Sequence, residues 1–296
     1  MRFLIRLQNI DRRILYVLVA IVLSVPLIIR PAKHPETVFP EVRKTYDTID
    51  AVKPDNIVLL SVSWGAGTQA ENDPQMQALM RHMFANNTKF VVMSWSLVGS
   101  ELSYQSGMHV QADVNKQRSR EGKPLLEYGK DWAHVGYKTG SISAIVSGLG
   151  ENFQQVMKQD RNGTPLTELA ATRNIKNYRD IGAVVDLTSV GLMGYWIAYL
   201  TTPKHIPLIY CPTAVMSATA YPYLDSGQLS GMLNGVMGAV QYETLVGQAD
   251  VATDASASSW ALSAAHIYII LLIVLGNLGY LVARKTGDRS GGSKLG

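Results

Sequence analysis

Small polar side chains stand at the ends of the apolar segments that are typical of β-strands. Ser63 lies near the end of the first such segment, and Asp186 near the end of a later one. The candidate ligand-binding residues of this kind are Ser63, Ser94, Asp186, Thr188, Ser189 and Thr213. Because ligands of parallel α/β sheets bind beyond the carboxyl ends of the strands, these residues indicate a site for a small polar ligand. The competing interpretation is that the hydroxyls cap the helices that follow.

Asp186 is the carboxylate best placed for chemistry. It follows the apolar residues 182–185, so burial would raise its pKa and suit it to act as a general base or to bind a ligand. The alternative is that Asp186 accepts hydrogen bonds from backbone N–H groups of the next loop. In that loop, Ser189 is expected to be the N-cap of the following helix.

Other catalytic or cofactor chemistry has little support. Residues 65–70 match G-x-G-x-x-A, but no carboxylate follows at the position that would hold a ribose, which favours a tight turn into a helix over a dinucleotide site. No G-x-S-x-G, H-E-x-x-H or paired-cysteine spacing occurs, and the single cysteine, Cys211, is expected in the core. We therefore expect no catalytic residues, no metal and no cofactor.

The elements that would position these residues alternate along the chain. We predict strands at 56–64, 89–95, 131–137, 181–187 and 206–211, and helices near 40–51, 71–86, 100–121, 140–158, 189–201 and 225–246. Apolar strands separated by connections long enough for a helix predict a parallel sheet covered on both faces. The expected fold is a three-layer, doubly wound α/β domain with a mostly parallel, Rossmann-like sheet, flanked by N- and C-terminal transmembrane helices.

Four glycines share one face of the helix predicted at 225–246, where Asp225 or Ser226 would be the N-cap. They are Gly227, Gly231, Gly235 and Gly238. Each glycine costs about 1 kcal/mol in a helix relative to alanine, so the pattern indicates that another backbone approaches this face closely. That partner is either the sheet of the same chain or a second subunit in an oligomer.

Two apolar segments lie near the ends of the chain. Residues 14–29 carry no charge, and residues 261–283 carry none except at a histidine, so both are candidates to span a membrane. The first segment is alternatively a cleaved signal peptide. Residues 182–200 are a rival third span, but a mid-span aspartate and a split into a β-branched half and a helical half favour a strand and a helix.

Basic residues flank both predicted spans and set the expected topology. Arg2, Arg6, Arg12 and Arg13 precede the first span, and Arg284, Lys285, Arg289 and Lys294 follow the second. By the positive-inside rule both termini face the cytoplasm. The predicted parts are a cytoplasmic N-terminus 1–13, a span 14–30, an extracytoplasmic α/β domain 31–260, a span 261–283 and a cytoplasmic tail 284–296. The formal net charge of +4 arises at the ends, which argues against nucleic acid as a partner.

These observations favour a non-enzymatic protein of the cell membrane, with two spans that hold an extracytoplasmic domain near the bilayer. The leading hypothesis is an oligomeric scaffold or a subunit of a membrane assembly, whose partners are the lipid bilayer and copies of itself or other membrane proteins. The alternative is a solute-binding or sensing domain for a small polar ligand. A membrane-tethered hydrolase or transferase comes third.

Overall fold

The computed structural model describes residues 11–31, 37–247 and 251–286, and these form two compact units. One unit lies within His34–Val251. The other combines the described parts of Met1–Lys33 and Ala252–Gly296. The basic residues Arg2, Arg6, Arg289 and Lys294 lie outside the described residues.

The larger unit is built on a six-stranded sheet in which every pair of neighbouring strands is parallel. The strands are β1 (Ile57–Ser63), β2 (Phe90–Ser94), β3 (Trp132–Tyr137), β4 (Ile181–Thr188), β5 (Leu208–Pro212) and β6 (Gly231–Met232). Their order in the sheet is β3-β2-β1-β4-β5-β6, which is the order of doubly wound Rossmann sheets. The predicted α/β class and the five predicted strands are confirmed, and β6 was not predicted.

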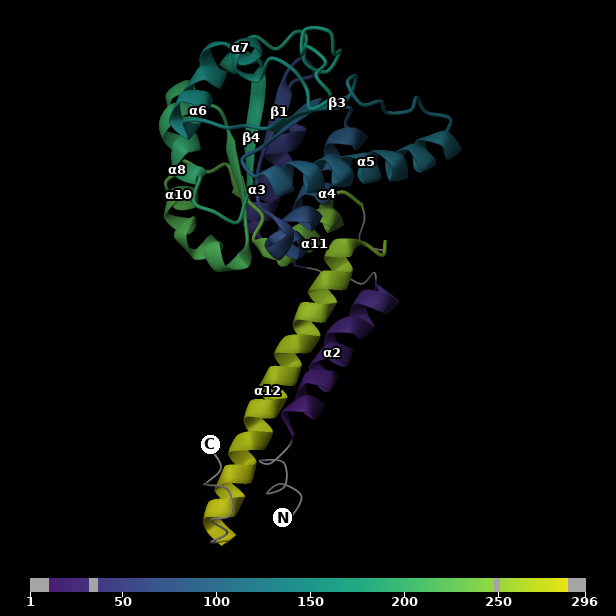
Figure 1. The fold of residues 1–296 in the computed structure, drawn as a ribbon, viewed down its shortest axis with the longest axis vertical. Coiled ribbons are helices and arrows are strands. Elements are labelled where there is room, and N and C mark those ends of the chain that lie inside the picture. The colour runs from purple at the N-terminus through teal and green to yellow at the C-terminus, as the bar shows by residue number, and fades with distance from the viewer. Residues whose placement is uncertain (1–10, 32–36, 248–250, 287–296) are drawn as a thin grey trace. The chain divides into compact units, whose positions relative to one another are not determined.

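Helices cover both faces of this sheet (Figure 1). The helices that pack on one face are α3 (Pro40–Asp50), α4 (Gln69–Ala85), α5 (Leu97–Arg120) and α11 (Gly235–Leu245). The helices on the other face are α6 (Ile142–Glu151), α7 (Phe153–Met157), α8 (Met193–Trp196) and α10 (Tyr221–Asp225). Short elements complete the unit: η1 (Ala66–Thr68), η2 (Tyr178–Asp180), the π-helical η3 (Ile197–Thr201), α9 (Thr202–Lys204) and η4 (Ala214–Thr219).

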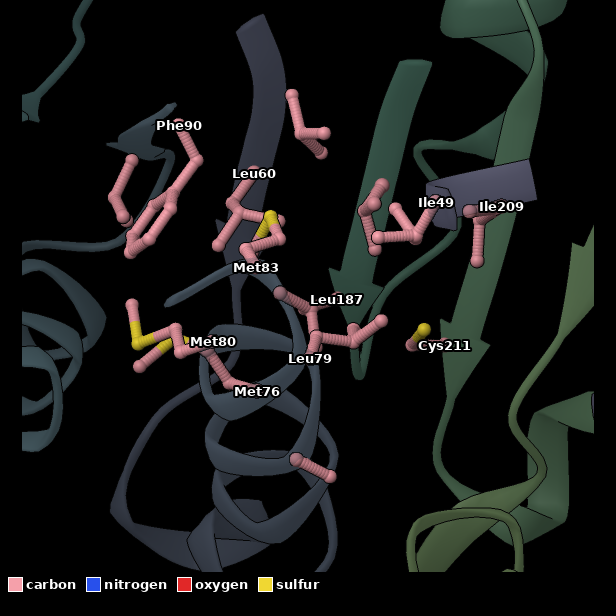
Figure 2. Close-up of a cluster of buried hydrophobic side chains, with 14 of the residues drawn as sticks. Ile49, Leu60, Met76, Leu79, Met80, Met83, Phe90, Leu187, Ile209 and Cys211 are labelled. Carbon is pink, nitrogen blue, oxygen red and sulfur yellow. The ribbon is translucent and has the colours of Figure 1, made fainter. Parts of the chain in front are cut away.

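Alternation along the strands divides the core between the two faces. In β1, Val58 and Leu60 pack under α4, whereas Leu59 points to the face that α6 and α8 cover. Figure 2 shows the first of these clusters, in which Met76, Leu79, Met80 and Met83 of α4 lie against Leu60, Phe90, Leu187, Ile209 and Cys211 of the strands. Both faces of the central strands are therefore buried, which explains why the strands are nearly continuous apolar runs.

The helix predicted at 225–246 is confirmed only from Gly235 on, and its first ten residues are not part of it. Asp225 ends α10 instead of capping a helix, Gly227 lies in a turn with φ 76°, and Gly231 belongs to β6. Helix α11 starts only at Gly235. The four glycines therefore do not form one helical face, because a turn and a short strand separate them.

Three of these glycines still lie where other atoms approach closely. A Cβ at Gly231 would lie 2.7 Å from the backbone Cα of Thr45, and a Cβ at Gly238 would lie 2.6 Å from the carbonyl carbon of Leu233. At Gly235 the nearest atom would be Oε2 of Glu71, at 2.8 Å, whereas no atom lies within 4 Å at Gly227. These contacts are within the chain. The predicted subunit contact is not tested by them.

The segment from 181 to 204 contains strand β4 followed by α8, η3 and α9, so the rival third span is wrong. Strand β4 continues past Asp186 to Thr188, and the first helix of the segment starts only at Met193. The predicted N-cap is also wrong, because Leu192 and not Ser189 precedes α8.

The smaller unit consists of the helices α2 (Arg12–Ile29) and α12 (Asp254–Thr286). Both are long and apolar enough to cross a membrane, and no residue of α2 is buried. The two helices contact each other: the hydroxyl of Tyr268 lies 3.5 Å from the carbonyl oxygen of Leu15, and Arg30 pairs with Asp254.

Candidate functional site

The position where ligands bind in a doubly wound sheet is the carboxyl end of the two strands between which the strand order reverses. Here these strands are β1 and β4. Their register places Ser61 beside Asp186 and Ser63 beside Thr188. The sheet therefore brings together four of the polar side chains that the sequence places at separate strand ends.

Asp186 is fully buried at this position. Ser61 donates a hydrogen bond from Oγ to Oδ1 of Asp186 at 3.0 Å, and the indole Nε1 of Trp95 donates to Ser61 Oγ at 3.1 Å. Oδ2 of Asp186 and Nε1 of Trp196 are buried, and neither has a hydrogen-bond partner of normal geometry among the described residues. No described backbone N–H donates to Asp186, so that interpretation of the residue is wrong.

Burial raises the pKa of Asp186 to about 7, because an ionised carboxylate loses its hydration in the core. The side chains of Ser61 and Trp196 oppose this rise by favouring the charged form. Near neutral pH the residue is thus divided between a neutral acid and a buried anion. The expected rise in pKa agrees with the geometry.

The hydroxyls around Asp186 bond to groups of the same chain. Ser63 Oγ donates to Thr188 Oγ1 at 2.7 Å, and Thr188 Oγ1 accepts from the N–H of Val190 at 2.9 Å. Ser189 donates both its N–H and its hydroxyl to the carbonyl oxygen of Ser63, at 3.2 and 3.3 Å. These bonds close the end of the β1–β4 pair and hold the loop after β4.

The side chains of two of the six predicted ligand-binding residues form no hydrogen bond with the side chains of this group. Ser94 is buried at the end of β2 and donates to the carbonyl oxygens of Val62 and Ser96, at 3.1 and 2.7 Å. Thr213 is buried after β5, where its N–H donates to Thr188 O at 3.1 Å. Capping does occur nearby, at Ser96, whose Oγ accepts from the N–H of Gly99 at the start of α5.

Two buried amides of α4 were missed from the sequence. Asn72 donates to the carbonyl oxygens of Thr188 and Cys211, at 3.3 and 3.2 Å, and Gln75 donates to those of Pro212 and Leu233, at 2.9 and 2.8 Å. These carbonyls belong to β4, to the end of β5 and to the residue after β6. The amides therefore take up backbone acceptors that a ligand would otherwise reach. The sequence does not single them out, because α4 also carries other polar and charged side chains, among them Glu71, Asp73 and Arg81.

A buried serine–histidine pair lies under the carboxyl end of β3. Ser103 Oγ lies 2.9 Å from Nε2 of His134, and the N–H of Gly136 donates to Nδ1 of the same ring at 3.0 Å. Because Nδ1 accepts, the proton of the neutral imidazole is on Nε2, so His134 donates to Ser103 and cannot take its proton. Burial also lowers the pKa of His134 to about 3. The pair is structural and is no hydrolase dyad.

No protein family, curated protein or solved structure was found to match this chain. Within residues 11–31, 37–247 and 251–286, no group of three or more His, Cys, Asp or Glu side chains is placed to hold a metal ion.

Five exposed apolar side chains follow the carboxyl ends of β2, β4, β5 and β6. We call them the apolar rim: Leu97, Val98, Val190, Val215 and Met237. Val215 is 87% exposed and Leu97 71%. The loops and helix starts that carry the rim, residues 95–100, 189–203, 213–224 and 234–242, contain no Asp, Glu, Lys, Arg or His. The rim is thus a set of apolar side chains on uncharged segments, at the edge of the sheet where ligands of this fold usually bind. The carboxylate of Glu71 lies beside it, where Oε2 accepts from the N–H of Ala214 at 2.8 Å.

Proposed function

We propose that the protein is a membrane-anchored scaffold, or a subunit of a membrane assembly, whose α/β domain docks on a partner subunit through the apolar rim. The observation that carries this proposal is the combination of exposed apolar side chains and missing charge. Burying one Val, Leu or Met side chain contributes about 1.5 to 3 kcal/mol, and the segments that carry the rim have no ionised side chain of their own to desolvate on docking. Exposed apolar patches of this kind mark interaction sites.

The polar groups of the β1–β4 crevice support this function over solute binding. Ser63, Thr188 and Ser189 bond to one another or to neighbouring backbone, and Asn72 and Gln75 occupy nearby carbonyls. A binding domain needs free donors and acceptors that converge on a ligand. The solute-binding alternative keeps one specific observation in its favour, the buried Oδ2 of Asp186 with no partner among the described residues.

The length and apolar composition of α2 and α12 support attachment to the bilayer. A contact within the α/β domain supports two anchors that lie next to each other. The backbone N–H of Phe39, just before α3, donates to Oε1 of Gln241 in α11 at 3.0 Å. The beginning and the end of the α/β domain are therefore side by side. We propose two transmembrane passes with the domain on the extracytoplasmic side, since the basic clusters lie at the two chain ends.

This topology predicts which positions react with a membrane-impermeant maleimide in intact cells. In a Cys211→Ser background, Leu125→Cys should be labelled, because Leu125 is 50% exposed on the proposed outer domain. Ser290→Cys should be labelled only after the membrane is permeabilised. Labelling of position 290 and not of position 125 in intact cells would reverse the orientation.

The docking proposal predicts that the rim is covered in native membranes. In the same background, Val215→Cys should react with maleimide at least about tenfold more slowly than Leu125→Cys, although Val215 is the more exposed of the two in the single chain. Detergent that dissociates the assembly should restore fast labelling. Equal rates in native membranes would show an open rim and contradict the proposal, and disulfide formation between two copies at position 215 would identify the partner as a second copy.

A further inference from the structure

A cleft lies at the carboxyl end of β3. Leu97 is the one residue that it shares with the apolar rim. Its volume is about 550 Å³. The lining comes from the start of α5, from the end of β3 and from the segment that follows α7: Leu97, Ser100, Glu101, Tyr137, Lys138 and Arg161 are among its residues. The N–H of Arg161 donates to the carbonyl oxygen of His134 at 2.8 Å and fixes that last segment beside β3.

The carboxylates of this cleft already have donors. Glu101 accepts from Arg161 Nη2 at 2.7 Å and from Gln105 at 2.8 Å, and these bonds hold the pKa of its carboxyl below the usual range. Asp160 accepts from the hydroxyl of Tyr128 at 2.9 Å and from the N–H of Thr164 at 2.8 Å. Both carboxylates therefore have hydrogen-bond donors without a cationic ligand.

Arg161 is occupied only in part, because its Nη1 is buried with no hydrogen-bond partner among the described residues. Its guanidinium carbon lies 3.8 Å from the centre of the Tyr104 ring, and the ion pair with Glu101 balances its charge. The ring face and the carboxylate together hold Arg161 in place. Lys138 is the second cation in the lining of the cleft.

Lys138 is half-buried, and its ammonium donates one hydrogen bond within the described residues. Its ammonium donates to the carbonyl oxygen of Met157 at 3.2 Å, and among the described residues no carboxylate forms an ion pair with it. Burial lowers the pKa of Lys138, since part of the hydration of the ammonium is lost. An ammonium has three donors, so two remain for a ligand.

We propose that this cleft binds a small organic monocarboxylate, whose negative charge pairs with the ammonium of Lys138. Of the two cations that line the cleft, Arg161 pairs with Glu101 and Lys138 has no ion pair, while Asp160 adds a second negative charge. A monocarboxylate therefore meets less repulsion from Glu101 and Asp160 than a dianion such as phosphate does. The hydroxyls of Ser100 and Tyr137 stand at the cleft as further donors, and the exposed side chain of Leu97 offers apolar contact to a short carbon chain. This site is separate from the β1–β4 crevice, and its cation Lys138 is not part of the apolar rim, although Leu97 belongs to both the cleft and the rim.

Thermal unfolding of the full-length protein in detergent tests this site, with sodium butyrate as the probe and sodium chloride at equal ionic strength as the reference. Butyrate should raise the melting temperature of the wild type in a saturable way. Lys138→Met should weaken the apparent affinity by at least about tenfold, because a charge-assisted contact is lost. Because phosphate stabilises proteins generally, the quantity compared is the shift that is lost in Lys138→Met, and this part should be smaller for sodium phosphate than for butyrate.

Lys89→Met is the matched control. Lys89 is also half-buried and also donates to one backbone carbonyl, Ala170 O at 3.1 Å, but it lies at the amino end of β2, away from the cleft. This variant should keep the full butyrate response. The proposal is overturned if butyrate does not raise the melting temperature of the wild type, or raises it equally in the wild type and in Lys138→Met. It is also overturned if the part of the shift that Lys138→Met removes is larger for phosphate than for butyrate.

Discussion

Replacing Gly231 by alanine should destabilise the α/β domain by about 3 kcal/mol. The added methyl group would lie 2.3 Å from Oγ1 of Thr45 and 2.7 Å from the backbone N and Cα of the same residue. Those backbone atoms belong to α3, so relief requires the whole helix to move away from β6. Chemical denaturation of the full-length protein in detergent, followed by tryptophan fluorescence, measures the loss.

Gly194→Ala is the control for this substitution. Gly194 lies in α8, where an added Cβ would meet no atom within 4 Å, so alanine should leave stability unchanged or raise it slightly through helix propensity. If the Gly231 and Gly194 variants unfold at the same denaturant concentration, the close packing of α3 on β6 is wrong.

The second large effect is a dependence of stability on pH that comes from Asp186. An aspartate in the unfolded chain has a pKa of about 3.9, whereas burial raises the folded-state pKa of Asp186 to about 7. Between these values the folded state holds a proton that the unfolded state has lost. The contribution of Asp186 to stability is therefore greatest at low pH, falls as the pH rises through this window, and levels off above it.

Asp186→Asn should remove this dependence, because an amide has the same shape and stays neutral. We compare the free energy of unfolding of the variant with that of the wild type. The difference, variant minus wild type, should rise by up to about 4 kcal/mol between pH values of about 4 and 8. Denaturation curves at several pH values give the difference. Asp225→Asn, which changes an exposed aspartate, controls for the loss of one negative charge. A difference that falls with pH or stays flat would show that Asp186 is ionised in the folded protein.

The pattern of apolar residues predicted five of the six strands. It failed at β6, which was predicted to be part of a helix. The strands β1, β2, β4 and β5 are buried on both faces, so their apolar runs stand out in the sequence. Strand β6 consists of Gly231 and Met232 and pairs only with β5. A two-residue strand has no periodicity of its own, and glycines spaced by four residues imitate a helical face. Tertiary contact with Thr45 of α3 determines this segment.

The candidate site was predictable as a set of side chains but not as an arrangement. The ends of apolar strands identify Ser63 and Asp186, yet their closeness depends on β4 pairing with β1, which local sequence does not specify. Nothing in the sequence singles out Lys138, because the role that we propose for it rests on its having no ion pair among the described residues. Asn72 and Gln75 were missed because their acceptors are backbone carbonyls far along the chain.

The pairing of β1 with β4 also constrains how the domain folds. Ser61 and Asp186 are 125 residues apart in the chain, whereas β1, β2 and β3 can pair within a much shorter segment. Closing so long a loop carries a large entropic cost before any contact compensates for it, so folding should be slow. Until β4 pairs with β1, the edge of β1 that faces away from β2 has unpaired backbone groups. Such an edge can pair with strands of other chains. A newly made chain therefore passes through an aggregation-prone interval that ends when residues 181–188 join the sheet.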